Sequence, residues 1–141
     1  MKEALKIVPG ILYLFVGLIS LLMAFKNLSA KRFLPFQEKA ASKRWDEIES
    51  PLKFVILFLM RLTGLGFLIV AILLIVCPVV SYFYPDRFYE FAIPGIAFIY
   101  CTGLFVINYR IYWKTQAETP WKGSLYAMAL IMTGIIIAFM A

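Results

Sequence analysis

Apolar residues form four long runs along the chain, and polar residues gather in the stretches between them. The runs cover residues 7–25, 54–84, 91–109 and 123–140, and only one charged residue, Arg61, interrupts them. Three of the runs have roughly the 20 residues that a helix needs to cross the hydrocarbon core of a bilayer, and the second is longer. Strands of a membrane β-barrel are instead about ten residues long and alternate apolar with polar positions. The pattern therefore predicts four transmembrane helices.

Capping residues and prolines indicate where these helices begin and end. Ser50 and Thr119 are each followed by a proline, an arrangement that favours a helix N-terminus. Pro78 lies inside the second apolar run and is expected to end or kink that helix. The sequence predicts a single all-α domain over residues 1–141, a polytopic membrane protein whose helices are expected at 7–25, 51–77, 91–109 and 120–140.

The segment that joins the first two helices has an apolar pattern of its own. Its apolar residues recur every three or four positions, at Phe33, Phe36, Ala40, Ala41, Trp45 and Ile48. Pro35 is suited to the first turn of a helix. We predict a short amphipathic helix at 35–49 that lies on the cytoplasmic membrane surface, with Trp45 near the headgroups. The competing interpretation is a solvated loop.

Positive charges are distributed unevenly between the two sides of the predicted bundle. The net charge is +6, and ten of the fourteen Lys and Arg residues lie in the connecting segments 26–53 and 110–122. The positive-inside rule places these segments in the cytoplasm and both termini outside. The short loops favour a bacterial inner membrane. Anionic headgroups attract such a basic surface, so we expect membrane lipids as partners and no nucleic acid.

Similar short motifs occur in the two halves of the chain. "VPGILYLF" (8–15) and "IPGIAFIY" (93–100) open the first and third helices, and "SPLK" (50–53) and "TPWK" (119–122) open the second and fourth. An internal duplication would arrange the chain as two helical hairpins related by an axis along the membrane normal. Pro-Gly pairs and capped prolines are also common at helix ends, so both explanations stay open.

Arg61 is the one charged residue within an apolar run, where ionised groups are costly. If Pro51 matches Pro120 in a duplicated hairpin, Arg61 lies roughly 15 Å inside the membrane. If the charge-free stretch that follows it crosses the membrane alone, Arg61 lies at the boundary and its side chain reaches the headgroups. Three roles follow. Arg61 is a buried arginine bonded to backbone carbonyls or Asn108, a site for an anionic headgroup or substrate, or a snorkelling anchor.

Small residues indicate where helices approach one another closely. Gly64, Leu68 and Ala71 share one face of the second helix with Arg61, so we expect another helix to pack there. In the fourth helix the small residues lie four apart, as Gly123 with Ala127, Ala129 with Thr133, and Gly134 with Ala138. These are expected to pack within the chain, against a second copy, or against another membrane protein.

The chain lacks many of the residues on which membrane-protein chemistry depends. It contains no histidine, and its apolar runs contain no Asp or Glu. These absences count against His-based metal sites and against transport coupled to a buried carboxylate. Cys77 and Cys101 lie at similar predicted depths, but buried cysteines usually act as small apolar residues. No cofactor, metal ligand or catalytic residue is predicted, and a disulfide between the two cysteines stays open.

These features favour a small, non-enzymatic membrane protein that acts through protein partners or through bound anionic lipid. The candidate ligand site consists of Arg61, Asn108 and Tyr109, the last two at the cytoplasmic end of the third helix. A first alternative is a transporter of a small molecule or anion with Arg61 in its site. A second alternative is a small membrane-embedded enzyme acting on a lipophilic substrate, against which the few titratable groups count.

Overall fold

Four long helices and one short helix account for most of the computed structural model, which describes residues 2–141. The long helices are α1 (Lys2–Leu28), α3 (Ser50–Phe83), α4 (Arg87–Thr115) and α5 (Trp121–Met140), and the short elements are α2 (Pro35–Ala41) and the 3₁₀ turn η1 (Trp45–Glu47). All four long helices are long and apolar enough to cross a membrane. The predicted all-α fold with four such helices is confirmed, including a short helix between the first two.

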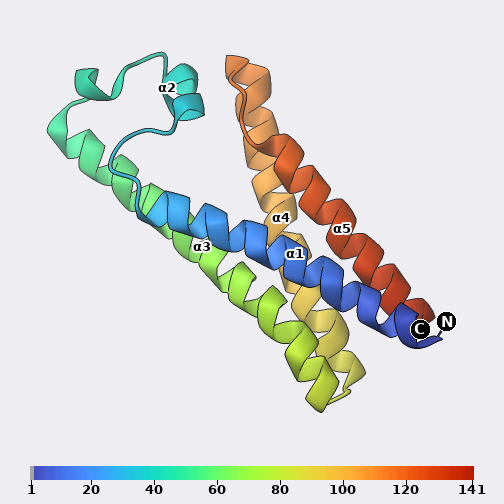
Figure 1. Cartoon of the computed structure of the whole chain (residues 1–141). Helices are drawn as coiled ribbons and strands as arrows, with labels where there is room; N and C mark the ends of the chain where they lie inside the picture. Colours follow the sequence, from blue (N-terminus) through green and yellow to red (C-terminus); the bar gives the residue numbers. More distant parts are fainter. Residues whose placement is uncertain (1) are drawn as a thin grey trace.

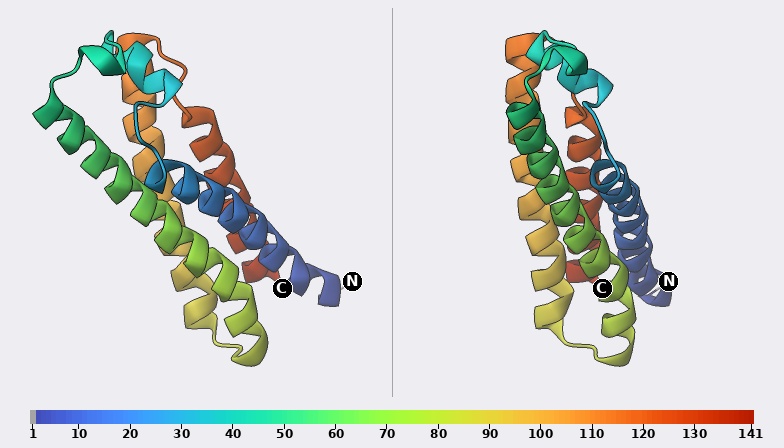
Figure 2. Two further views of the ribbon diagram at one scale, coloured as in Figure 1. Left: turned by 60° about the vertical axis from the view of Figure 1, so that its left-hand side comes forward. Right: turned by 90° about the vertical axis from the view of Figure 1, so that its left-hand side faces the viewer.

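The long helices form a ring in which each packs against two others. α1 packs against α3 and α5, and α4 packs against α5 and α3. Both termini lie with the α3–α4 turn at one end of the bundle (Figure 1). The elements α2 and η1 lie with the α4–α5 connection at the other end, as both views in Figure 2 show. We call these the terminus end and the α2 end.

Helix α3 is longer than the sequence indicated, because Pro78 does not end it. The helix continues through Pro78 to Phe83. A proline removes one backbone hydrogen bond, and membrane helices tolerate this where a neighbouring helix packs closely. Here the Pro78 ring faces Gly10 of α1, where a built Cβ would lie 3.3 Å from the proline Cβ. The helix ends before Pro85, since a residue that precedes proline disfavours the helical conformation.

The α1–α3 contact is a seam of small residues repeated every seven positions. Its members are Gly10, Gly17 and Ala24 in α1, and Gly64, Ala71 and Pro78 in α3. A Cβ built on Gly64 would lie 3.1 Å from the backbone nitrogen of Leu28. The two backbones therefore approach as closely as small residues allow. The prediction that another helix packs beside Gly64 and Ala71 is confirmed, and that helix is α1.

Tyrosines pack onto glycines at two of the other contacts of the ring, α1–α5 and α3–α4. Tyr13 of α1 lies on Gly134 of α5, where a built Cβ would be 2.5 Å from the ring Cε1. Tyr100 of α4 lies on Gly66 of α3, and its hydroxyl donates a 3.2 Å hydrogen bond to the carbonyl of Thr63. Each glycine makes a notch in one helix that holds the aromatic ring of the next.

The segment between α1 and α3 is not the single helix at 35–49 that its apolar spacing predicted. Helix α2 ends at Ala41, and Ser42 follows in the left-handed conformation with a φ of 52°. The chain then folds back, so that the rings of Phe33 and Trp45 meet edge to face at 5.1 Å. Ile48 is buried. The apolar side chains partly cover one another, and α2 leans against α4.

Candidate functional site

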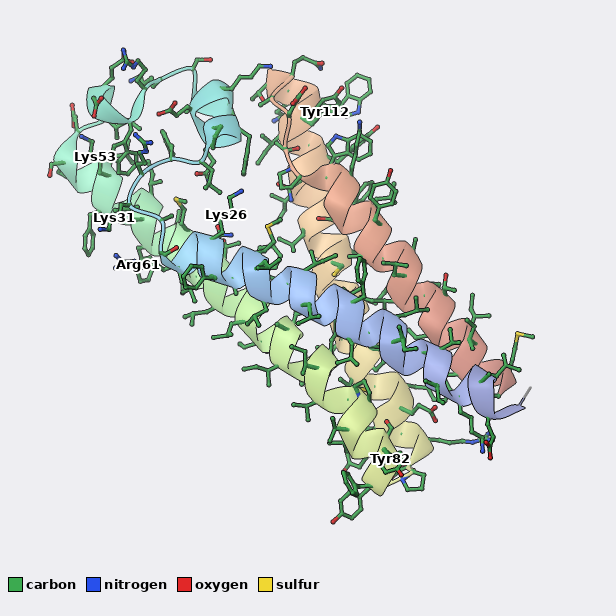
Figure 3. The ribbon with its side chains drawn as sticks, viewed as in Figure 1. Lys26, Lys31, Lys53, Arg61, Tyr82 and Tyr112 are labelled. Atoms are coloured by element: carbon green, nitrogen blue, oxygen red, sulfur yellow. The ribbon has the colours of Figure 1, made fainter. Side chains whose placement is uncertain are left out.

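Arg61 lies beside the end of helix α1 that points toward the α2 end of the bundle. Gly64 contacts Asn27 and Leu28, the last two residues of α1. Arg61 precedes Gly64 by three residues, which is less than one helical turn. Figure 3 shows Arg61 near the point where α1 ends, at the same end of that helix as Lys31.

The spacing of polar residues along the helices bears on the depth at which Arg61 would lie in a membrane. The residues that bracket the apolar stretches are Lys6 and Lys26 in α1, Arg61 and Tyr82 in α3, and Glu90 and Arg110 in α4. Members of each pair are 20 or 21 residues apart, so each stretch spans roughly 30 Å. This length matches the hydrocarbon core of a bilayer. The spacing therefore favours Arg61 at a membrane boundary over a position 15 Å deeper.

The side chain of Arg61 is exposed, and no hydrogen bond or ion pair among the residues that the structure describes involves it. Its neighbours Thr63 and Gly64 hold the contacts with α4 and α1 instead. Figure 3 places Arg61 on the outer side of α3, while Tyr112 of α4 lies across the bundle. Nothing in this part of the chain bonds Arg61 to backbone carbonyls or to Asn108, so its guanidinium is free to meet an external anion.

Asn108 and Tyr109 belong to a different region, where α4 meets the start of α5. The backbone carbonyl of Asn108 accepts a 2.7 Å hydrogen bond from the Thr119 hydroxyl, which ties the α4–α5 connection to α4. The Tyr109 ring stacks on Phe105 and meets Trp121 edge to face, both at 5.5 Å. The structure does not bring either residue into contact with Arg61. The observed contacts give Asn108 and Tyr109 a role in packing, and a role for them in ligand binding stays a prediction.

A basic pocket lies where the chain leaves α1. It has a volume of about 370 Å³, and its charged lining residues are Lys26, Lys31, Arg32 and Glu38. Phe33, Leu34 and Pro35 supply an apolar wall. Glu38 is engaged within the segment, since its Oε1 accepts a 3.4 Å hydrogen bond from the Trp45 backbone nitrogen. Three cations against one carboxylate give the pocket a positive potential that suits an anion.

An apolar groove runs along the outside of the α1–α3 pair. Its lining consists of Leu21, Leu22, Ala24, Phe25 and Leu28 from α1 and Leu68 from α3, around a volume of about 390 Å³. Both hollows fall within the size range of small-molecule sites. Sequence reasoning used Lys26, Lys31 and Arg32 only as members of the basic segment 26–53, to orient the bundle and to predict a general attraction to anionic lipid. It missed the pocket and groove because each depends on where α1 ends relative to α3.

Polar groups inside the bundle are few and offer little chemistry. Cys77 and Cys101 are both free thiols buried in the same apolar core cluster. The Tyr13 hydroxyl is a buried polar atom with no hydrogen-bond partner among the described residues. Among the described residues, no three His, Cys, Asp or Glu side chains come together to hold a metal ion. The groups available for function therefore lie mainly on the surface, around the end of α1.

Comparisons with protein-family models, with curated proteins and with solved structures found no match to the chain.

Proposed function

We propose that the chain is a multi-pass protein of a bacterial inner membrane, with its α2 end in the cytoplasm and both termini outside. The four apolar helices and the roughly 30 Å between their polar ends support this placement. The excess of Lys and Arg in segments 26–53 and 110–122 supports the orientation. Exposed aromatic residues accompany both ends, as is typical of membrane interfaces: Trp113 at the α2 end, and Tyr82 and Tyr84 at the other.

Within that placement, the protein acts without catalysis by binding anionic lipid of the cytoplasmic leaflet. The observation that carries this function is the exposed Arg61, which makes no hydrogen bond or ion pair among the described residues and lies near the end of α1 (Figure 3), where the chain continues to the exposed Lys31 and Arg32. A negative leaflet attracts each such cation by about 1 kcal/mol. An arginine at this depth avoids the cost of a charge in hydrocarbon, because its guanidinium reaches the headgroup layer.

Two finer features belong to the same proposal. The ring order α3–α1–α5–α4 suits a twofold duplication, because exchanging α1 with α4 and α3 with α5 leaves the order unchanged. The Tyr13–Gly134 and Tyr100–Gly66 contacts exchange in the same way, with a shift of two residues at the tyrosines and one residue at the glycines. In α5, Gly134 packs against Tyr13, whereas Ala129 and Thr133 are exposed. Those two positions are the small residues that a second copy or a protein partner would meet.

The test is lipid retention by the purified protein in native mass spectrometry, from nanodiscs that contain equal phosphatidylglycerol and phosphatidylcholine. The wild type is expected to retain phosphatidylglycerol preferentially. Arg61→Gln should weaken this retention by about 1 kcal/mol, roughly fivefold. Lys6→Gln removes one charge at the terminus end and serves as the matched control; a smaller loss than for Arg61→Gln is expected, because Glu3, one helical turn away, already offsets the charge of Lys6. Equal retention of the two lipids by the wild type would refute a function based on anionic lipid.

A further inference from the structure

We propose that the groove between α1 and α3 holds one acyl chain of the same lipid whose anionic headgroup meets Arg61. The inference rests on the proposed function and narrows it to a single site for a diacyl phospholipid with a negative headgroup. It differs from general attraction to a charged leaflet, because it requires a shaped apolar surface next to the charge.

The groove and Arg61 are aligned along one face of α3. Leu68, which lines the groove, follows Arg61 by seven residues, or about two helical turns, so both side chains point the same way. The rise between them is roughly 10 Å. A lipid whose phosphate lies beside the guanidinium would therefore place the start of an acyl chain at the level of Leu68. The groove begins nearer the guanidinium, at Leu28 beside Gly64, and runs along α1 through Phe25 to Leu21.

The end of α1 connects the groove with the basic pocket. The end of α1 lines both hollows, through Leu28 in the groove and Lys26 in the pocket, and the residues that follow it, Lys31 among them, line only the pocket. Figure 3 shows Lys26 pointing toward α2, on a different side of α1 from Arg61. The pocket cations that remain to share a headgroup with Arg61 are Lys31 and Arg32, which follow the end of α1. Lys26 faces the space beneath α2 instead.

The lining of the groove fits an acyl chain better than a partner helix. Helices that associate in membranes place small residues at the contact so that their backbones approach. Here five of the six lining residues are Leu or Phe, and the one alanine, Ala24, is buried against α3. Bulky, flexible side chains around a narrow hollow suit a flexible chain. The bilayer supplies no hydrophobic drive for a chain to enter, so packing holds the chain and the cations select the headgroup.

The experiment fills the groove without touching any charge. Leu68→Trp places an indole in the hollow from α3, and Leu22→Trp does so from α1, where position 22 is exposed. Ile99→Trp on the exposed face of α4 is the matched control. Binding of phosphatidylglycerol to each full-length variant is titrated by native mass spectrometry, which counts the lipids bound. Circular dichroism melts establish that each variant folds. The two groove variants place the indole in the hollow from different helices, α3 and α1.

One tightly bound phosphatidylglycerol is expected for the wild type. Either groove variant should lower the affinity for that lipid at least as much as the roughly fivefold loss expected for Arg61→Gln. Ile99→Trp should leave the affinity unchanged. If Arg61→Gln weakens binding and both groove variants bind like the wild type, the lipid is held by charge alone. The groove site is then wrong and the proposed function stands. Two tight lipids, one lost with each kind of variant, would also overturn a shared site.

Two further outcomes distinguish an anionic lipid from other possible occupants of the groove. A dimer in the wild type that the groove variants convert to a monomer would assign the groove to a second copy of the chain and overturn the lipid site. No preference for phosphatidylglycerol over phosphatidylcholine in any variant would refute the proposed function together with this inference.

Discussion

The contact between Tyr13 and Gly134 leads to the sharpest stability prediction, because it leaves no room for one methyl group. In Gly134→Ala the new Cβ would lie 2.5 Å from Cε1 of Tyr13. Carbon atoms pack best at about 3.5–4.0 Å, so the ring and the helix must separate by roughly 1 Å. Tyr13 is only 2% exposed and belongs to the central core cluster, so its ring has no free space to enter. Overpacking of this kind costs about 1–3 kcal/mol.

The assay is unfolding in mixed micelles with increasing SDS, followed by circular dichroism. Gly103→Ala is the control, because position 103 is exposed in α4 and a built Cβ there meets nothing within 4 Å. That substitution should be neutral, or stabilising by up to about 1 kcal/mol through helix propensity. The control separates the effect of the methyl group at a contact from the effect of replacing glycine in a helix.

A second variant identifies Tyr13 as the obstacle. Tyr13→Leu removes the ring atoms that a Cβ at position 134 would meet, although it leaves a cavity. The cost of Gly134→Ala should therefore be smaller in the Tyr13→Leu background, with a coupling energy of about 0.5–3 kcal/mol. If Gly134→Ala is as stable as Gly103→Ala, or if the two substitutions at 13 and 134 are simply additive, α1 and α5 do not pack through this notch.

Two other predictions address the buried hydroxyls and the orientation of the bundle. Tyr13→Phe removes a buried hydroxyl without a partner among the described residues and should stabilise the fold by up to about 1–3 kcal/mol in the same assay. Tyr100→Phe loses a hydrogen bond to Thr63 and should lower the free energy of unfolding by about 0.5–1.5 kcal/mol. If both substitutions stabilise the fold, or both destabilise it, the assignment of these two hydroxyls is wrong. For orientation, a membrane-impermeant maleimide added to intact bacterial spheroplasts should label Asp86→Cys and leave Lys43→Cys unlabelled, since both native cysteines are buried. The reverse pattern would invert the proposed topology.

The four long helices could be predicted because their signal is local. A continuous run of apolar residues is visible without knowledge of any partner helix, and charged or capped stretches bound it. The same local reasoning misplaced some ends. Helix α2 ends at Ala41 and α4 ends at Thr115, and the residues that follow, Ser42 and Gln116, are in the left-handed conformation with φ values of 52° and 53°. Glycine usually marks such an end, so a serine or a glutamine there gives no sequence signal.

The candidate site could not be predicted as a unit, because its parts come from segments far apart in the chain. The apolar face beside Arg61 was recognisable from the small residues Gly64 and Ala71. Which helix covers that face, and where the covering helix stops, depends on the α1–α3 packing. The groove exists because α1 packs closely enough at Gly64 to bring Leu28 to that level of α3. Asn108 was grouped with Arg61 by depth alone, and depth does not determine which side of a bundle a residue occupies.

The position of Arg61 follows from a mismatch in length between α3 and its neighbours. At 34 residues, α3 is roughly 51 Å long, well beyond one crossing of a bilayer. The close contact at Gly64 sets the end of α1 against α3, so the residues of α3 before Arg61 continue past that end. Charge-free residues 62–83 cover the hydrocarbon thickness by themselves. In the proposed placement, a positive charge at residue 61 is favourable, because it lies at the level where α3 would leave the hydrocarbon and meet anionic headgroups.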